Sequence, residues 1–441
     1  MKTKLFACLL ALCAVLPLCC ACGGAPGTAT TPSATLQTSE KTAEAPESET
    51  TETLPAKKVS SPLSERPNYV LREGASSQEM RETAVRAMRD MLSILWYPAN
   101  KITYGKTGSG EGKDFVYLPS EIYGGMAYTN ATSGIFQWLE YYDPETGCLT
   151  VPDGSYFNST LGNSCAACVM WGWSPVVTSI TWRYTYDMVQ KKGCLRLGPY
   201  TYPDDLESLQ DMPTANICAE NGKDTMFRSY AEVKTADGLV TYAPTGGHAV
   251  MATENAHVEY ANGKIDGEAS YIIIQEQRSG IFQTSDDFVK TEDGEKHHYN
   301  GRIGVRFSFN ELYELFYIPC TCKEFIGQAP YVVPGVELEG EVSSLEDLSG
   351  AKIKSPYKIT VLYADIYDEE GTLAEHRSSV MTNSDINTKT PGVQEIPLSR
   401  VNLTRAGIVR KLESGKTYTV KISALDATGT QYEIASFPFT K

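Results

Sequence analysis

The stretch Gly162–Trp173, GNSCAACVMWGW, places a cysteine where a thiol becomes reactive. A small polar lead that ends at Ser164 runs into an apolar segment too rich in Ala and Met to favour a strand. These residues predict an N-capped helix whose first turn holds Cys165. Backbone N–H groups and the helix dipole stabilise negative charge there, which lowers the pKa of a thiol and yields a nucleophilic thiolate. The alternative is an inert core thiol, because Ala, Val, Met and Trp surround it.

A thiolate mechanism also needs an imidazole beside the sulfur and a polar group that orients the imidazole. Among the five histidines, His248 follows two glycines that permit close approach, and it begins a predicted strand. His257 is the rival base and lacks these glycines, while a purely structural role for His248 stays open. A strand predicted at 271–277 ends in three polar residues, Gln275, Glu276 and Gln277. Alternation of side chains leaves open whether Glu276 or its two glutamine neighbours face His248.

The cysteines allow two further hypotheses. Seven follow Cys22, so three bridges leave one free thiol. Cys165 and Cys168, taken with Cys320 and Cys322, also have the composition of a zinc or redox site. Cys-x-Cys is an awkward chelate spacing, however, and no βαβ pattern surrounds Cys165. We therefore predict neither a metal nor a cofactor.

Helices and then antiparallel strands must position these residues. Ser76 and Glu79 form a capping box, apolar residues then recur at helical spacing, and Pro98 is expected to close that helix. The cysteine helix is expected to end near Ser174. A last short helix is expected at 311–316, capped by Ser308. Strands are predicted at 239–242, 248–251, 271–277 and 304–307. The fold class is thus α+β, with Cys165 on the helical half and His248 on the sheet half.

The character of the chain changes at about residue 332. From there to residue 441 the pattern has strands of period two without helices, which predicts a β-sandwich. The segment from Leu412 to Tyr418 is similar to the tyrosine corner of fibronectin type III domains. This second domain shows no catalytic constellation, and spacer and wall-binding roles are both open.

The N-terminus has the composition of a targeting segment. Lys2 and Lys4 precede an apolar run that ends in cysteines, which resembles a bacterial lipoprotein signal over residues 1–22. Cys22 is the expected lipidation site, with Cys19 and Cys20 as alternatives, and a plain secretory signal is the other possibility. Residues 23–66 lack large apolar side chains and predict a disordered tether. The protein is thus expected at the cell surface, lipid-anchored to the outer face of the cytoplasmic membrane.

The formal charge of −15 over 441 residues argues against nucleic acid as a partner. The glycine-rich turn near Gly125 lacks the spacing and the lysine of a phosphate loop.

The order of segments resembles the NlpC-type papain-like cysteine peptidases, which are bacterial cell-wall endopeptidases. In that family a Gly-x-Pro-Tyr loop precedes Asp-Cys-Ser-Gly, and a Lys-Pro-Gly-Asp-Leu turn, a Gly-His strand and a strand with a third polar residue follow. Here Gly125–Tyr128 matches the first loop with Ala in place of Pro, and Ser164–Ala167 matches the cysteine motif at the cysteine alone. Residues 234–239 match the turn, and Gly247–Val250 matches the Gly-His strand. The resemblance spans roughly 69–328, and we set the papain-like domain at 67–330.

The resemblance implies roles for individual residues. Cys165 is expected to be the nucleophile and His248 the general base, with Glu276 orienting the imidazole. Tyr128 is expected to line the substrate site. Ser164 replaces the family's substrate-reading Asp, and Ala replaces the Ser after the cysteine, which puts the usual substrate preference in question. The implied activity is amide cleavage in peptidoglycan stem peptides or another extracellular peptide or amide. The alternative is a non-catalytic wall-binding or adhesion lipoprotein that keeps the papain-like shell.

Overall fold

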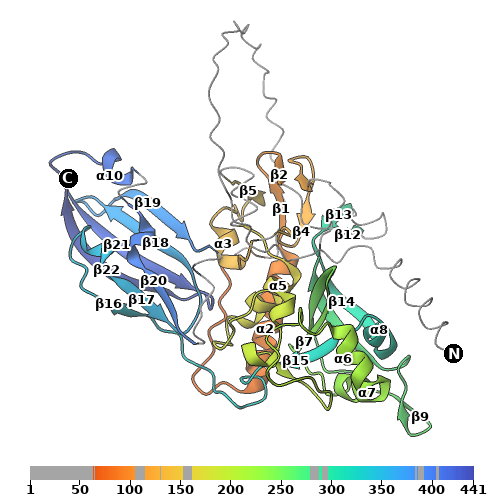
Figure 1. The fold of residues 1–441 in the computed structure, drawn as a ribbon. Helices are drawn as coiled ribbons and strands as arrows, with labels where there is room; N and C mark the ends of the chain where they lie inside the picture. The colour runs from red at the N-terminus through yellow and green to blue at the C-terminus, as the bar shows by residue number, and fades with distance from the viewer. Residues whose placement is uncertain are drawn as a thin grey trace, which may run out of the picture.

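The computed structural model describes residues 63, 65–104, 115–129, 131–151, 161–278, 288–290, 296–382, 385, 392–403 and 407–441. It is a mixed α+β structure with several antiparallel sheets (Figure 1). The predicted signal with Cys22 and nearly all of the predicted tether lie outside the described residues. Among the helices that are described, none combines the length and the apolar character that crossing a membrane requires.

A six-stranded sheet forms the centre of the N-terminal part, and each pair of neighbours in it is antiparallel. In spatial order its strands are β14 (Gly301–Ser308), β11 (Tyr271–Gln277), β8 (Gly246–Ala252), β7 (Gly238–Ala243), β15 (Ile318–Thr321) and β6 (Leu195–Arg196). Helices α2 (Ser77–Ser93) and α5 (Cys165–Trp173) pack against each other and against this sheet. The strands predicted around His248 and Glu276 are therefore confirmed as neighbours in one sheet.

Helix α2 begins as the sequence predicts and ends earlier. The Ser76–Glu79 capping box is formed, with Ser76 Oγ accepting from the Glu79 backbone. Ile94 is extended (φ −63°, ψ 129°), so the helix ends at Ser93, and Pro98 instead lies in the strand β1 (Leu95–Pro98). The expectation that Pro98 closes the helix is wrong, because the chain turns into a strand before it reaches that proline.

A buried ion pair ties α2 to the entry of β7. Arg81 Nη1 lies 2.8 Å from Asp237 Oδ1, and both side chains are almost fully buried. Asp237 also accepts from the Thr321 hydroxyl (2.6 Å) and from the Lys234 backbone N–H (2.7 Å). These bonds satisfy a carboxylate that would otherwise be costly to bury, and they hold the turn at 234–237 against the first helix.

A second sheet and two hairpins extend this part of the chain. The five-stranded sheet runs in the order β12 (Phe288–Lys290), β13 (Lys296–Tyr299), β4 (Tyr123–Gly124), β1 and β5 (Cys148–Leu149). The hairpins are β2 (Ile102–Tyr104) with β3 (Phe115–Tyr117), and β9 (Tyr260–Ala261) with β10 (Lys264–Ile265). The other helices of the described residues in this part are α3 (Ile135–Leu139), α6 (Thr214–Asn221), α7 (Lys223–Tyr230), α8 (Phe309–Glu314) and the 3₁₀ turns η1 (Thr185–Asp187) and η2 (Gln190–Lys192). Helix α8 has the predicted Ser308–Glu311 capping box.

The C-terminal part contains two antiparallel sheets (Figure 1). One has three strands, β16 (Glu337–Glu339), β17 (Lys352–Ser355) and β20 (Gln394–Pro397). The other has four, β19 (Leu373–Val380), β18 (Ile359–Tyr367), β21 (Thr417–Asp426) and β22 (Gln431–Thr440). The 3₁₀ turn η5 (Asp347–Ser349) lies between β16 and β17, and the turn η6 (Leu398–Val401) and the short helix α10 (Ile408–Lys411) lie between β20 and β21. The expectation of a domain without helices is therefore wrong at α10. The Tyr418 hydroxyl accepts from the Glu413 backbone N–H at 3.0 Å, a bond of the tyrosine-corner kind.

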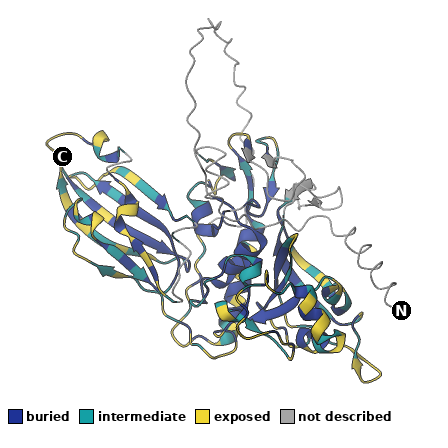
Figure 2. Ribbon diagram, viewed as in Figure 1, coloured by how far each residue is buried: buried dark blue, intermediate teal, exposed yellow. Residues whose placement is uncertain are grey.

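The two parts share one apolar core, and buried segments occur in both parts (dark blue in Figure 2). Gln137 of α3 donates its side-chain amide to the Met381 carbonyl at 2.8 Å in a buried position. The Tyr363 hydroxyl of β18 lies 2.6 Å from Glu140 Oε1. Polar contacts of this kind fix the C-terminal sheets against α3.

Candidate active site

Helix α5 presents Cys165 at its first position. Ser164 is the N-cap residue with an extended backbone (φ −95°, ψ 174°), and its carbonyl accepts from the Cys168 N–H at 2.8 Å. Its hydroxyl makes no capping hydrogen bond. The first N–H groups of a helix have no acceptor within the helix. The backbone N–H of Cys165 therefore points to the end of the helix where the sulfur lies.

The segment that carries Tyr128 is held against the start of α5 by the backbone. Tyr128 and Asn163 form a parallel bridge, with Asn163 N–H donating to the Ala127 carbonyl at 3.1 Å. Gly162 permits this approach, because its φ is +84° and a Cβ there would lie 2.4 Å from the Ala127 oxygen. The Tyr128 hydroxyl consequently reaches the sulfur of Cys165, at 4.0 Å.

The sulfur lies beside β8 where this strand separates from β11. The two strands pair only through Ile274 with Ala252 and Gln275 with Met251. The sulfur lies 3.9 Å from the Gly247 carbonyl oxygen and accepts a hydrogen bond from the Ala249 backbone. The sulfur thus lies next to two backbone groups of β8, on the edge of β8 opposite to β7.

His248 and Glu276 meet across the same separation. His248 Nε2 lies 2.7 Å from Glu276 Oε2, and both residues are buried. The other oxygen of Glu276 accepts from Arg302 Nε at 2.5 Å, and Arg278 Nη1 lies 3.8 Å from it. Because Nε2 bonds to Glu276, the hydrogen bond between His248 and Cys165 uses the remaining ring nitrogen, Nδ1.

The neighbouring glutamines face the other side of β11. Gln275 donates to the Val85 carbonyl of α2 at 3.0 Å, and Gln277 donates to the Met126 carbonyl at 2.7 Å. Strand alternation thus directs Glu276 alone toward His248, and the question that the sequence left open is resolved by this pairing.

The surroundings of Cys165 favour its thiolate. Burial alone raises the pKa of the thiol, but the positive charge of His248 and the hydrogen bond with it lower the pKa. Hydrogen bonds from the Ala249 backbone and the Tyr128 hydroxyl lower it further, so the net pKa of Cys165 lies below its ordinary value. A low-pKa thiol next to an imidazole is the arrangement of a nucleophilic cysteine.

The partner groups are shifted in the matching directions. Burial lowers the pKa of His248, but the charge and hydrogen bond of Cys165, followed by those of Glu276, raise it well above the usual value. Burial raises the pKa of Glu276, but the hydrogen bond and charge of His248, followed by Arg302, lower it to about 2. The arrangement therefore favours a thiolate, an imidazolium and a carboxylate in series.

Cys165 differs from its neighbour Cys168 in ways that bear on the core-thiol alternative. Cys168 belongs to the main apolar core, and burial raises the pKa of its thiol well above the ordinary value. Cys165 and Tyr128 contact each other apart from that core. The inert packing role thus fits Cys168. Cys165 is 1% exposed and His248 is 9% exposed, so access to the sulfur is narrow.

The other candidates lie elsewhere. All seven cysteines of the described residues are free thiols. Within the described part of the chain, no three His, Cys, Asp or Glu side chains are grouped so that they could hold a metal, so Cys165, Cys168, Cys320 and Cys322 do not converge as ligands. The rival base His257 is exposed, lies 2.9 Å from Glu259 and stacks on Tyr271.

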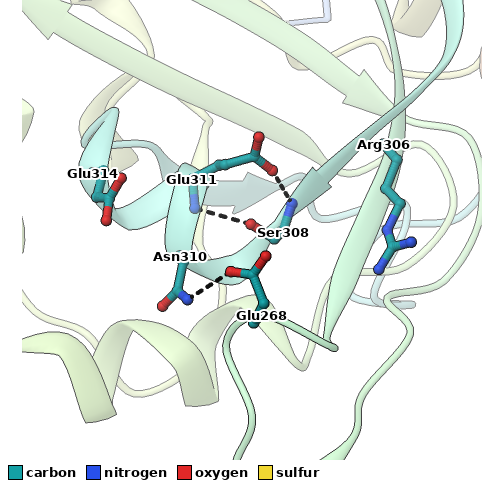
Figure 3. A pocket seen from close by; sticks show the side chains of 6 residues that line it. All are labelled: Glu268, Arg306, Ser308, Asn310, Glu311 and Glu314. Carbon is teal, nitrogen blue, oxygen red and sulfur yellow. Dashed lines mark hydrogen bonds between the residues drawn. The ribbon is translucent and has the colours of Figure 1, made fainter.

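A cavity of about 350 Å³ opens between β14 and α8 (Figure 3). Its lining residues are Glu268, Arg306, Ser308, Asn310, Glu311 and Glu314. Glu311 caps α8 through the Ser308 backbone, and Glu268 accepts from the Asn310 amide at 3.1 Å. These side chains serve the local fold and share no residue with the cysteine site.

Sequence reasoning missed three parts of the site. Arg302 pairs with Glu276 in the β11–β14 register, but a lone arginine gives no signal before the register is known. The backbone groups of Gly247 and Ala249 were also missed, although the two glycines before His248 indicate a close approach at that place. Neither the models of known protein families nor the sequences of curated proteins match this chain.

Proposed function

We propose that the chain is a cysteine peptidase or amidase of the NlpC type, with a papain-like arrangement, acting on peptidoglycan stem peptides outside the cell. The observation that carries the proposal is the hydrogen-bonded series Cys165–His248–Glu276, with the sulfur at the N-terminus of α5. A thiolate, an imidazolium and a polar orienting group are the three parts of nucleophilic cysteine catalysis.

The chemistry follows from these positions. The Cys165 thiolate attacks the carbonyl carbon of the substrate amide, and the carbonyl oxygen becomes an oxyanion. His248 then gives its Nδ1 proton to the leaving amine, which breaks the C–N bond and leaves a thioester. The neutral imidazole next takes a proton from water, and the hydroxide attacks the thioester. The C–S bond then breaks, which releases the carboxylic acid and restores the Cys165 thiolate beside the imidazolium. Glu276 holds the ring by its Nε2 throughout.

Two donors are placed to stabilise the oxyanion. The backbone N–H of Cys165 stands at the first position of α5, where no intrahelical acceptor exists. The Tyr128 hydroxyl lies 4.0 Å from the sulfur and donates toward it in the free protein. A substrate carbonyl attacked by the sulfur comes close to both groups. One such donor contributes on the order of 100-fold or more to kcat.

The location of the activity is part of the proposal. A lipidated Cys22 anchors the chain to the outer face of the membrane, and the polar segment 23–66 after it is the tether that brings the catalytic part within reach of the wall. The lipoprotein-type signal and the polar composition of 23–66 support this placement.

The test is digestion of purified peptidoglycan by the wild type and by Cys165→Ala, with released fragments separated and weighed by mass spectrometry. Cys168→Ala is the matched control, because it removes a thiol one helical turn away that belongs to the core. We expect new amine and carboxyl ends with the wild type and the control, and none with Cys165→Ala. Identical products from all three proteins reject hydrolysis of the wall.

A second candidate is a non-catalytic wall-binding protein. The near-complete burial of Cys165 is the observation that favours it, because a nucleophile must meet its substrate. In that case Cys165→Ala sediments with purified wall as well as the wild type does, and neither protein releases fragments.

A further inference from the structure

A cluster of partly exposed tyrosines borders the end of β8 at which the sulfur lies. Thr185 of η1 packs on Gly247, since a Cβ on this glycine would lie 2.4 Å from the Thr185 hydroxyl oxygen. The carbonyl of the same glycine lies 3.9 Å from the sulfur of Cys165. Tyr242 is the residue paired with Gly247 on β7. The segment around η1 therefore contacts the same residue, Gly247, whose carbonyl faces the candidate nucleophile.

Three tyrosines and one arginine make up the cluster, which we call the tyrosine platform: Arg183, Tyr184, Tyr186 and Tyr242. The rings of Tyr184 and Tyr186 are stacked, with centroids 5.0 Å apart and planes 19° apart. Tyr186 and Tyr242 are T-shaped at 5.9 Å. The guanidinium carbon of Arg183 lies 4.3 Å from the centre of the Tyr184 ring, and Arg183 donates to the Tyr184 hydroxyl.

The platform is held by its backbone and leaves its side chains half-buried. The Tyr186 carbonyl accepts from the Leu209 N–H at 2.8 Å and from the Ser208 hydroxyl. The Thr214 hydroxyl bonds to both the N–H and the carbonyl of Tyr242. Rigid tyrosines lose little conformational entropy when a ligand binds them, which is why they are frequent in recognition surfaces.

Arg183 has no ion-pair partner among the residues that the structure describes. A comparison is available in the same domain, because Arg196 lies in the same way over a tyrosine ring, 4.9 Å from Tyr202. Arg196 is paired with Asp204 at 2.8 Å. Arg183 lies two residues before Thr185, which packs on Gly247, and the carbonyl of Gly247 lies 3.9 Å from the sulfur. In a chain of net charge −15, a cation without an ion-pair partner among the described residues is a place for an incoming carboxylate.

We propose that the tyrosine platform is a subsite for a free carboxylate of a peptide substrate. The inference rests on the proposed function and narrows its substrate class to peptides that carry a carboxylate near the attacked bond. A guanidinium binds a carboxylate through two parallel N–H···O bonds. Arg183 and Tyr186 both lie against the ring of Tyr184, so the platform offers a charge and hydroxyl groups rather than the open ring face on which a sugar stacks.

The test uses two forms of one stem tetrapeptide, with its carboxylates free or converted to amides. Binding to full-length Cys165→Ala is measured by calorimetry, and cleavage by the wild type is measured as kcat and KM. We expect the free-carboxylate peptide to bind about 10-fold more tightly than the amide, the worth of one charged hydrogen-bonding contact. Arg183→Gln should remove this preference through KM, and Arg183→Lys should restore part of it. Arg196→Gln is the matched control and should keep it.

Each outcome separates the subsite from the hydrolysis. Three results overturn the proposed subsite, even where the wild type cleaves both peptides. The two peptides bind equally, or neither binds, or the preference for the free carboxylate survives in Arg183→Gln. An Arg183-dependent preference without cleavage supports the subsite and rejects the peptidase. Loss of fold in Arg183→Gln is checked by thermal unfolding. If that variant is unfolded, Tyr186→Leu replaces it, and a retained tenfold preference in that variant also overturns the subsite.

Discussion

His248 Nε2 lies 2.7 Å from Glu276 Oε2, across the opening where β8 and β11 separate. This bond fixes which ring nitrogen faces the sulfur, because an imidazole with one nitrogen bound to a carboxylate has only Nδ1 left. The carboxylate also raises the pKa of His248, and the resulting positive charge is what lowers the pKa of Cys165. Orientation and charge are thus supplied by one contact.

The first prediction concerns the reactivity of Cys165. Its pKa is lowered chiefly by His248 against the raising effect of burial, so the rate of alkylation by iodoacetamide should reach half its maximum below the ordinary thiol pKa of about 8.5. In His248→Ala the midpoint should move upward. The measurement is the pH dependence of label on the Cys165 peptide, by mass spectrometry. The partly exposed Cys148 serves as an internal control, because its labelling at each pH should be the same in both proteins. Equal midpoints for Cys165 would contradict the ion pair.

The second prediction concerns Glu276→Gln, which keeps the shape and removes the charge. The pKa of His248 should fall and that of Cys165 should rise, because the thiolate loses part of its partner's charge. The acidic limb of kcat/KM should therefore move to higher pH and the alkaline limb to lower pH. At the optimum kcat/KM should fall on the order of 100-fold. Glu259→Gln is the matched control, because Glu259 bonds to the exposed His257. An unchanged profile for Glu276→Gln would show that Glu276 has no orienting role.

The sequence predicted the elements of the site better than the contacts between them. The start of α2, the extent of α5 and the strands of His248 and Glu276 follow from capping residues and periodicity, which are local. Arg81 carries no such signal, since it becomes the buried partner of Asp237 only through tertiary packing. Arg302 likewise gives no sign of its role until β14 is known to lie beside β11. These pairs depend on which residues of distant strands and helices lie opposite each other, and this register is not apparent from one sequence.

The third prediction concerns acid stability. Burial raises the pKa of Glu276, but His248 and then Arg302 lower it from 4.5 to about 2. A carboxylate with a depressed folded-state pKa stabilises the protein above pH 4.5 and loses this contribution as the pH falls to 2. The shift corresponds to about 3 kcal/mol. Arg302→Gln should lower the free energy of unfolding at pH 7 by only about 1 kcal/mol, because Arg302 is about one-third exposed.

Urea unfolding from pH 7 to pH 2 measures this effect. The difference between Arg302→Gln and the wild type should narrow as the pH falls from 5 to 2, because Glu276 becomes protonated in both proteins. Arg306→Gln is the control on the same strand, since Arg306 lies over Tyr271 and is paired with Ile273 in the β11–β14 register, where Arg302 is paired with Glu276. A difference that stays constant with pH would assign the effect of Arg302 to packing alone.

The last prediction separates backbone strain from the close approach that positions Tyr128. Gly162→Ala introduces a side chain at φ +84° and 2.4 Å from the Ala127 oxygen, so it should destabilise the fold by about 3 kcal/mol. Gly74→Ala shares a positive φ of +71° but meets nothing within 4 Å, so it should cost about 1 kcal/mol. The Gly162 variant alone should also slow alkylation of Cys165, because the bridge between Tyr128 and Asn163 is displaced. If both variants lose the same free energy of unfolding and alkylate Cys165 at the same rate, backbone strain alone explains the effect. The close approach of Gly162 to Ala127 would then have no role in positioning Tyr128.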